Sequence, residues 1–185
     1  MLKLFFVSNN QYKIKEAMEI IDSRIIELKP LALKIEEIQS DDAMKIVNDK
    51  VIKAFSKVKR PLFVEHTGLY IHDFGNLPGG LTQIIWDSLK ADKFCEFFGN
   101  RKNTKAIAKT IIGYCDGKSI YTFEGSIEGN IAKTPKGNKN FQWDCVFIPK
   151  GYNQTFAELG DEKNKISMRR QAIQSLSDYI RGLYI

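Results

Sequence analysis

Glu65 and His66 stand side by side in the segment FVEHTG (63–68), directly after a run of apolar, β-prone residues. A carboxylate and an imidazole at one place can bind a divalent metal ion or accept a proton from water. The apolar run predicts a buried strand that ends by presenting the two side chains at its tip, where α/β proteins place their chemistry. Thr67 and Gly68, followed by NLPGG (76–80), then predict a polar corner that leads into a helix near residue 81 or 82.

Lys13 is the second residue that suggests chemistry, because it lies in the first turn of an expected helix. A strand over 2–8 precedes Asn9 and Asn10, which predict a turn and a cap for a helix from Gln11 to about Asp22. A lysine at a helix N-terminus is unfavourable for the helix dipole, whereas free backbone N–H groups there bind phosphate. Two interpretations follow: a solvated surface lysine, or a phosphate site made by Lys13 with Ser8, Asn9 and Asn10. The spacing of these residues favours the phosphate site.

Two acidic residues, Glu36 and Glu37, lie in an extended segment between Leu33 and Ser40. They are ordinary surface charges if the segment stays apart from the Glu65 corner. If the segment packs beside that corner, one of them becomes a natural oxygen ligand for a metal ion.

Phe141, Trp143 and Asp144 form the last candidate group, ahead of a short strand over 146–148. An aromatic ring next to a carboxylate suits a purine, because the ring stacks on the base and the acid accepts a hydrogen bond from the base or sugar. The alternative is that Phe141 and Trp143 are core residues.

The elements that must hold these residues follow the order βαβαβ, then a helix, then an antiparallel meander. We expect strands over 2–8, 25–28, 62–65, 105–114, 120–127, 130–132 and 146–148, and helices over 11–22, 40–57 and 81–98 and at the C-terminus. Asp116 and Gly117 predict a hairpin between two of the strands. This order predicts an α/β fold with a mixed central β-sheet flanked by helices.

Composition limits the class of protein. The 185 residues are 43% hydrophobic and 27% charged, which predicts one globular domain over residues 1–185. No apolar run has the length of a membrane span, and the N-terminal segment does not resemble a signal peptide. From these two observations we expect a cytoplasmic location, and three widely spaced cysteines predict core thiols in a reducing compartment. A net charge of +6 favours anionic partners, but the lysines are scattered, which makes nucleic acid an unlikely partner and a polyphosphate a better one.

Four motifs in this order resemble the non-canonical purine nucleoside triphosphate pyrophosphatases, the inosine/xanthosine triphosphatase family. They are SNNxxKxxE (8–16), VEHTGL (64–69) with LPG (77–79), FxWD (141–144) with GYxQTFAE (151–158), and EKNxxSxR (162–169). The resemblance covers nearly the whole chain. It implies a fold of two lobes with the active-site cleft between them, hydrolysis of a purine nucleoside triphosphate to monophosphate and pyrophosphate, Mg²⁺ as cofactor and a homodimer.

The resemblance also implies roles for individual residues. Lys13 and the turn from Ser8 to Asn10 would hold the triphosphate, beside the polar residues Thr67 and Gly68. Glu37, Glu65 and His66 would be the candidate metal ligands, with Lys13, Glu65 and His66 as the catalytic residues. Contacts with the nucleotide would come from residues late in the chain, namely Phe141, Trp143, Asp144, Lys163, Met168 and Arg169.

Two positions depart from the family pattern. His66 stands where the family has an aspartate that serves as metal contact and presumed base, and Met168 stands where it has a purine-contacting histidine. Imidazole nitrogen is a poorer ligand for Mg²⁺ than oxygen, so Mn²⁺ becomes a possible cofactor. Three outcomes are open: His66 is the base, Glu65 or a neighbour replaces it, or the chain is a catalytically degenerate nucleotide-binding paralogue with a regulatory role. Met168 cannot donate a hydrogen bond to a 6-oxo purine, which predicts an altered base preference.

Overall fold

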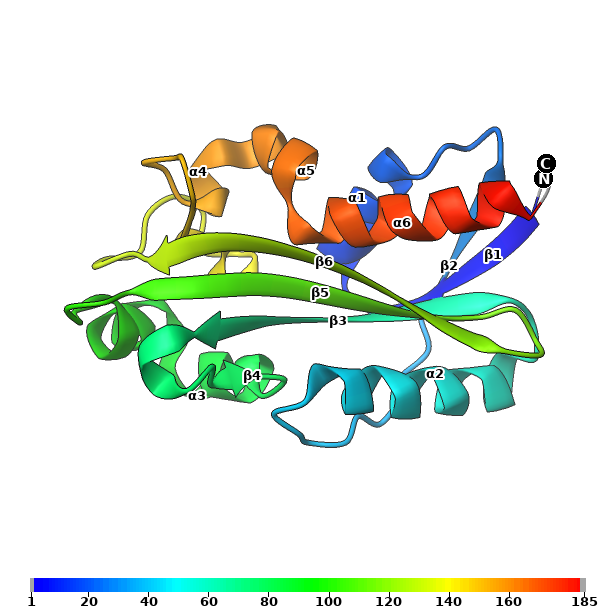
Figure 1. Ribbon diagram of the computed structural model, residues 1–185, viewed down its shortest axis with the longest axis horizontal. Helices are drawn as coiled ribbons and strands as arrows, with labels where there is room; N and C mark the ends of the chain where they lie inside the picture. The colour runs from blue at the N-terminus through cyan, green and yellow to red at the C-terminus, as the bar shows by residue number, and fades with distance from the viewer. Residues whose placement is uncertain (1, 184–185) are drawn as a thin grey trace.

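A seven-stranded mixed sheet forms the centre of the computed structural model, which describes residues 2–183 (Figure 1). The strand order is β2-β1-β3-β5-β6-β7, and β4 pairs with β3. β1 is parallel to β2 and β3, whereas the pairs from β3 to β7 are antiparallel. The strands are β1 (Leu2–Val7), β2 (Ile26–Leu31), β3 (Leu62–Ile71), β4 (Pro78–Gly79), β5 (Lys105–Cys115), β6 (Ile120–Ile131) and β7 (Phe147–Pro149).

Helices cover both faces of this sheet, as the sequence predicts. Figure 1 shows α1 and α6 on one face and α2 and α3 on the other. The helices are α1 (Gln11–Ile20), α2 (Ala43–Val58), α3 (Thr82–Phe94), α4 (Phe156–Leu159), α5 (Lys163–Ile166) and α6 (Met168–Gly182). None of the helices in residues 2–183 has the length and hydrophobicity needed to cross a membrane.

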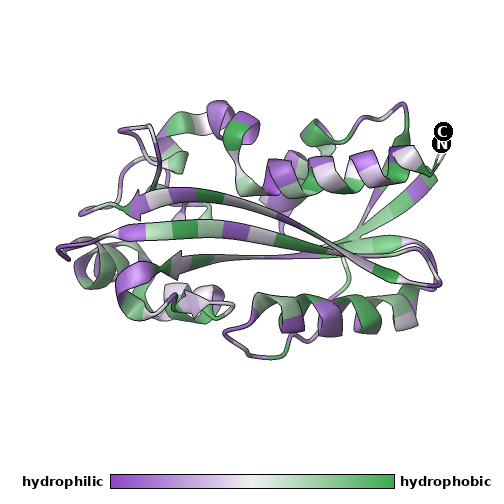
Figure 2. Cartoon of the chain, in the orientation of Figure 1, coloured by the Kyte–Doolittle hydropathy of each residue, from purple (hydrophilic) through white to green (hydrophobic). Residues whose placement is uncertain are grey.

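The apolar pattern of the chain explains these layers. Figure 2 shows hydrophobic residues along β1 and at the start of β3, and mixed character along α2 and α6. Alternate β3 residues serve opposite faces: Phe63 packs in the core with α1 and α6, whereas Leu62 and Val64 pack in the core with α2. Side-chain caps at Asp42 and Ser167 fix where α2 and α6 begin.

The central strand corrects one expectation. β3 does not end at Glu65 but continues to Ile71, and it is paired with β5 along its full length. Gly68 is therefore no turn residue. A Cβ atom at Gly68 would lie 2.4 Å from the carbonyl oxygen of Gly79, so the glycine permits a close approach of the two backbones.

The meander is also simpler than expected. The hairpin at Asp116 and Gly117 is confirmed, with Asp116 Oδ1 accepting from two backbone N–H groups of the turn. The strands expected over 120–127 and 130–132 are one continuous strand, β6. Gly125 interrupts the apolar pattern because α6 lies against it: a Cβ atom there would be 2.0 Å from the carbonyl oxygen of Met168.

Candidate active site

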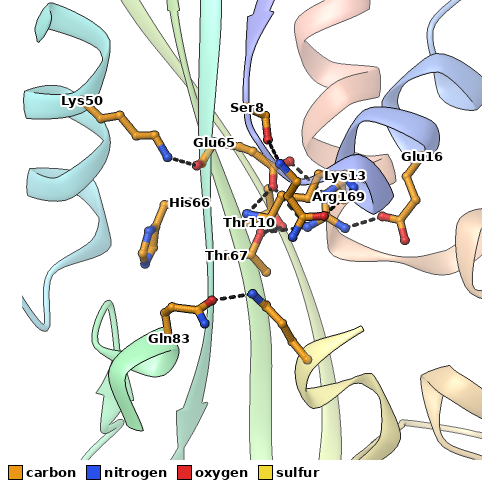
Figure 3. A network of polar contacts seen from close by, with 12 residues as sticks. Ser8, Lys13, Glu16, Lys50, Glu65, His66, Thr67, Gln83, Thr110 and Arg169 are labelled. Atoms are coloured by element: carbon orange, nitrogen blue, oxygen red, sulfur yellow. Dashed lines mark hydrogen bonds and ion pairs between the residues drawn. The ribbon is translucent and has the colours of Figure 1, made fainter. Parts of the chain in front are cut away.

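The candidate site lies where β1 ends and β3 continues. β1 pairs with β3 only at Phe5 and Phe6, so this edge of β3 is unpaired from about Glu65 until β4 pairs with it at Leu69 and Tyr70. Because side chains alternate along a strand, Glu65 and Thr67 point toward α6, whereas His66 points to the opposite face, toward α2 (Figure 3). Glu65 and His66, expected at the end of a strand, therefore lie in its interior, and their side chains point to opposite faces of the sheet.

Six charged side chains form one continuous series of contacts, which we term the charge chain. Lys13 Nζ lies 2.9 Å from Glu65 Oε1, and Arg169 binds the same carboxylate through Nε at 2.8 Å and Nη2 at 3.1 Å. Arg169 also donates to Glu16. Lys163 completes the series at 2.7 Å from Glu16 and 2.6 Å from Asp144. Cations and anions therefore alternate from Lys13 to Asp144, and the total charge is balanced.

Burial makes this balance important. The Arg169 side chain is 2% exposed and the Glu65 side chain 1% exposed. Burial opposes ionisation of Glu65, but Arg169 and Lys13 outweigh it and hold the pKa of the carboxyl well below its usual range. Burial lowers the pKa of Lys13 and raises that of Asp144, even though each has an ion-pair partner. Removing any one of these charges would leave the buried group as a whole with an unbalanced charge.

A cavity of about 210 Å³ opens at the Lys13 end of the charge chain. Its polar wall residues are the four expected phosphate residues, the expected metal ligand Glu37 and three further side chains from α2, α3 and the 3-10 turn before β7; they are Ser8, Asn9, Asn10, Lys13, Glu37, Lys50, Gln83 and Gln142. Asn10 caps α1 by accepting from the Lys13 N–H at 3.2 Å. Gln142 Nε2 donates to Gln83 Oε1, and both side chains line the cavity; Figure 3 shows Gln83 on the far side of Thr67 from Lys13. We term this space the phosphate cavity.

Lys50 is a second cation of the phosphate cavity that sequence reasoning missed. Its Nζ lies 2.6 Å from Glu37 Oε1 and donates to the Glu65 carbonyl oxygen at 3.3 Å. The signal was available in part: Lys50 neighbours Val51 and follows Val47 by three residues, which places it near the buried face of α2.

His66 contacts oxygen atoms through both ring nitrogens. Nε2 lies 3.0 Å from the Gly80 carbonyl oxygen, and Nδ1 lies 3.5 Å from Glu37 Oε2. Burial raises the pKa of Glu37, but His66 and Lys50 outweigh it and lower the pKa to about 2. Glu37 is thus an ionised carboxylate at the wall of the phosphate cavity.

The structure does not bring the three expected metal ligands together. Glu37 and His66 are neighbours, but the Glu65 carboxylate lies on the other face of β3 and is held by Lys13 and Arg169. Within residues 2–183 there is no group of three or more His, Cys, Asp or Glu side chains that could hold a metal ion. Glu37 alone suits Mg²⁺, which is often bound through one or two carboxylates together with substrate phosphates.

A second cavity, of about 320 Å³, lies at the Asp144 end of the charge chain. We term it the base cavity. Glu16, Asp144 and Lys163 contribute its buried charges, and Tyr12 and Phe141 its aromatic wall. Tyr12 and Phe141 directly precede Lys13 and Gln142 of the phosphate cavity, so the same two chain segments contribute to both cavities.

Two residues expected to face the nucleotide lie in the core instead. Trp143 is 3% exposed and packs against Phe147 and Phe156, so the core alternative holds for this residue. Met168 is 1% exposed in the same cluster. The expectation that Met168 packs against a base is therefore wrong in this structure: Met168 enters the core, while Arg169 points to the site.

Several residues of the site were not expected from the sequence. Thr110 Oγ1 lies 2.7 Å from Thr67 Oγ1 across the β3–β5 pair, and Thr67 accepts from Arg169 at 3.4 Å. Glu16 belongs to a motif, but its place between Arg169 and Lys163 depends on tertiary structure. Tyr12, Gln83 and Gln142 carried no signal of their own.

These features define an α/β protein with a cationic cavity and a neighbouring aromatic and acidic cavity, joined by buried ion pairs. The chain belongs to the Ham1 family, whose model matches residues 4–179. It is 32% identical over 183 residues to a dITP/XTP pyrophosphatase of Methanopyrus kandleri, covering 98% of this chain and 97% of that protein. It is 33% identical to a dITP/XTP pyrophosphatase of Saccharolobus solfataricus, covering 98% and 95% of the two chains. The solved structure of a HAM1 protein from Coxiella burnetii superposes with a TM-score of 0.83 at 25% identity, covering 98% of this chain and 100% of that one. The family and the fold expected from the motifs are thereby confirmed.

Proposed function

We propose that this protein hydrolyses non-canonical purine nucleoside triphosphates, such as dITP and XTP, to the nucleoside monophosphate and pyrophosphate. One water molecule is consumed as the bond between the α-phosphorus and the bridging oxygen breaks. The observation that carries the proposal is the charge chain, which joins a cationic cavity to an aromatic and acidic one. The relatives from M. kandleri and S. solfataricus are named as dITP/XTP pyrophosphatases, which supports the same reaction.

The phosphate cavity supplies positive charge for the triphosphate. Lys13 and Lys50 line it, and Asn9 and Asn10 place it at the N-terminus of α1, where the helix dipole favours an anion. Such preorganised donors stabilise the charge that develops on phosphate oxygens during transfer.

We propose Mg²⁺ as cofactor, with Mn²⁺ as an alternative, and Glu37 as the residue that would hold it. Glu37 is ionised and lines the phosphate cavity, so a metal ion that arrives with the triphosphate meets a hard oxygen ligand. The ion would supply charge neutralisation on the phosphates. His66 has a nitrogen at this place, which predicts weaker Mg²⁺ binding than two carboxylates would give.

We assign the role of general base to His66 rather than Glu65. A carboxylate whose pKa is held well below its usual range is a poor proton acceptor, and Glu65 is bound by two cations. The Gly80 carbonyl oxygen beside Nε2 favours a proton on that nitrogen, so Nδ1 is the nitrogen that would accept the proton, and the Glu37 carboxylate 3.5 Å away would stabilise the resulting imidazolium.

Base recognition falls to the residues of the base cavity. Asp144 can accept a hydrogen bond from a purine N–H, and Phe141 offers a ring for stacking. Because Met168 lies in the core, it gives no direct reason for an altered base preference, and selection among bases depends on Asp144 and Lys163.

The test is pyrophosphate release from dITP, ITP, XTP and the canonical triphosphates, with Mg²⁺, with Mn²⁺ and with EDTA. A parallel thermal-shift assay measures binding of the same compounds. Release from dITP or XTP with a divalent ion, lost on His66→Asn, is the expected result. If His66→Asp raises Mg²⁺-dependent release, His66 limits the use of Mg²⁺. Binding without release from any compound would contradict the proposal and favour a nucleotide-binding regulatory protein.

We also propose a homodimer and a cytoplasmic location, on the basis of the family resemblance and of three free, buried cysteines. Light scattering after size exclusion tests the dimer: a mass near 21.2 kDa, rather than twice that value, would contradict it.

A further inference from the structure

Tyr12 is a large aromatic residue exposed at the mouth of the base cavity. It lies in the first turn of α1, and its residue surface is 47% exposed. Its ring stacks on Phe141, with centroids 4.8 Å apart and planes inclined by 21°. Both rings line the base cavity beside Asp144 and Lys163. A stack at this place is either ordinary packing between α1 and a loop or part of the binding site.

The two partners of this stack differ in how firmly they are held. Phe141 has the ammonium group of Lys163 4.4 Å from its ring centroid and the guanidinium group of Arg169 at 5.8 Å. Both cations are buried and are fixed by the charge chain, so the Phe141 ring rests on a rigid base. In residues 2–183 Tyr12 stacks on no ring other than Phe141, and no hydrogen bond holds its hydroxyl. Phe141 is therefore the fixed wall and Tyr12 the movable one.

We propose that Tyr12 is a base-binding residue, and that it forms with Phe141 an aromatic clamp that opens to take the purine base between the two rings. This inference rests on the proposed function and adds a residue to its substrate site. A base inserted between two rings needs a separation of about 7 Å, because each stacked contact takes about 3.5 Å. An exposed tyrosine reaches that separation by a side-chain rotation, without displacement of the buried charges.

The energetics favour such an exchange. Opening the clamp costs one ring stack between Tyr12 and Phe141, and the bound base restores two. Stacking tolerates any purine, because every base has a π-face. The clamp therefore contributes affinity, while Asp144 and Lys163 are left to select among bases.

The experiment compares Tyr12→Ala and Tyr12→Phe with Met18→Ala as matched control. Met18 is on the same helix, is 53% exposed and does not line the base cavity. The readouts are kcat and KM for dITP and the inhibition constant of inorganic tripolyphosphate, which has no base. We expect Tyr12→Ala to raise KM about 10-fold, as loss of one base stack does, with kcat and the inhibition constant unchanged. Tyr12→Phe, which keeps the aromatic ring, should have the wild-type KM.

Two results would overturn the clamp. One is an unchanged KM in Tyr12→Ala, and the other is an equal rise in the inhibition constant of tripolyphosphate, which would show a general disturbance of α1. A fluorescence titration with 2-aminopurine riboside triphosphate separates this inference from the proposed function. Quenching in the wild type that is lost in Tyr12→Ala supports the clamp even if no compound is hydrolysed. Absence of quenching in the wild type overturns it even if dITP is hydrolysed.

Discussion

Replacing Glu16 by glutamine tests how the charge chain stabilises the fold. The side chain keeps its size, but the charge between Arg169 and Lys163 is lost. The buried cations Arg169 and Lys163 then each lose one of their anionic partners. Breaking a buried ion pair by removing one partner costs about 3–5 kcal/mol. For a chain of 150–250 residues this corresponds to a decrease in Tm of about 6–20 °C.

Glu128→Gln is the matched control. Glu128 lies 2.6 Å from Lys150, which is nearly the distance between Glu16 and Lys163, but the two side chains are 63% and 74% exposed. An exposed pair contributes at most about 1 kcal/mol, so the control should lose less than about 4 °C. The comparison separates the effect of burial from that of distance.

The assay is thermal unfolding followed by circular dichroism, repeated over a series of pH values. Burial opposes ionisation of Glu16, but Arg169 and Lys163 outweigh it and lower its pKa from 4.5. The stability that Glu16 contributes is therefore present above about pH 4.5 and is lost as the pH falls through the lowered pKa. The difference between wild type and Glu16→Gln should shrink below that pH. Equal losses in Glu16→Gln and Glu128→Gln at neutral pH would refute the reasoning.

Three further predictions concern other parts of the structure. Gly125→Ala should lower the free energy of unfolding, measured by urea titration, by several kcal/mol, because a Cβ atom would lie 2.0 Å from an α6 carbonyl oxygen. Gly182 has open space around it, so Gly182→Ala should change the free energy of unfolding by less than about 1 kcal/mol. An unchanged midpoint for Gly125→Ala would show that β6 and α6 are not so close. Lys50→Met should weaken inhibition by tripolyphosphate about 10-fold, since a charge at the phosphate cavity is lost, and Lys53→Met on the same helix should not; equal effects would contradict the role of Lys50. Thr110→Val should lower Tm by about 2–4 °C, because a buried hydrogen bond contributes about 1 kcal/mol, and an unchanged Tm would argue against that bond.

Much of the fold follows from local pattern. The helices over 11–22 and 40–57, the hairpin at Asp116 and the order of elements were predictable because apolar period, caps and turn residues act over a few positions. The order of the four sequence motifs was sufficient to predict the family. These signals need no knowledge of the partners that a segment meets in space.

The predictions that were wrong concern positions where contacts with a distant segment determine the local structure. Gly68 signals a turn by its type, but pairing with β5 keeps it inside a strand, and a close approach by Gly79 explains the glycine. The same cause separates Glu65 from His66, since a strand sends adjacent side chains to opposite faces.

The candidate site shows the same limit at the level of single residues. Which of two neighbours faces the site, Arg169 or Met168, depends on how α6 packs against the sheet. Phe141 reaches the base cavity, whereas Trp143, two residues later, lies in the core. Motif positions identify the region, but the direction of each side chain comes from tertiary packing.

The alternating order of the charge chain also limits how this sequence can diverge. A descendant that replaces one member alone carries an unbalanced buried charge, and the cost of about 3–5 kcal/mol is a large share of an ordinary stability of about 5–15 kcal/mol. Lys13, Glu16, Glu65, Asp144, Lys163 and Arg169 are spread over most of the chain, yet a change at one of them alters the charge balance of the others. We therefore expect these six positions to change in a coordinated way, and the exposed pair Lys150–Glu128 to tolerate single substitutions.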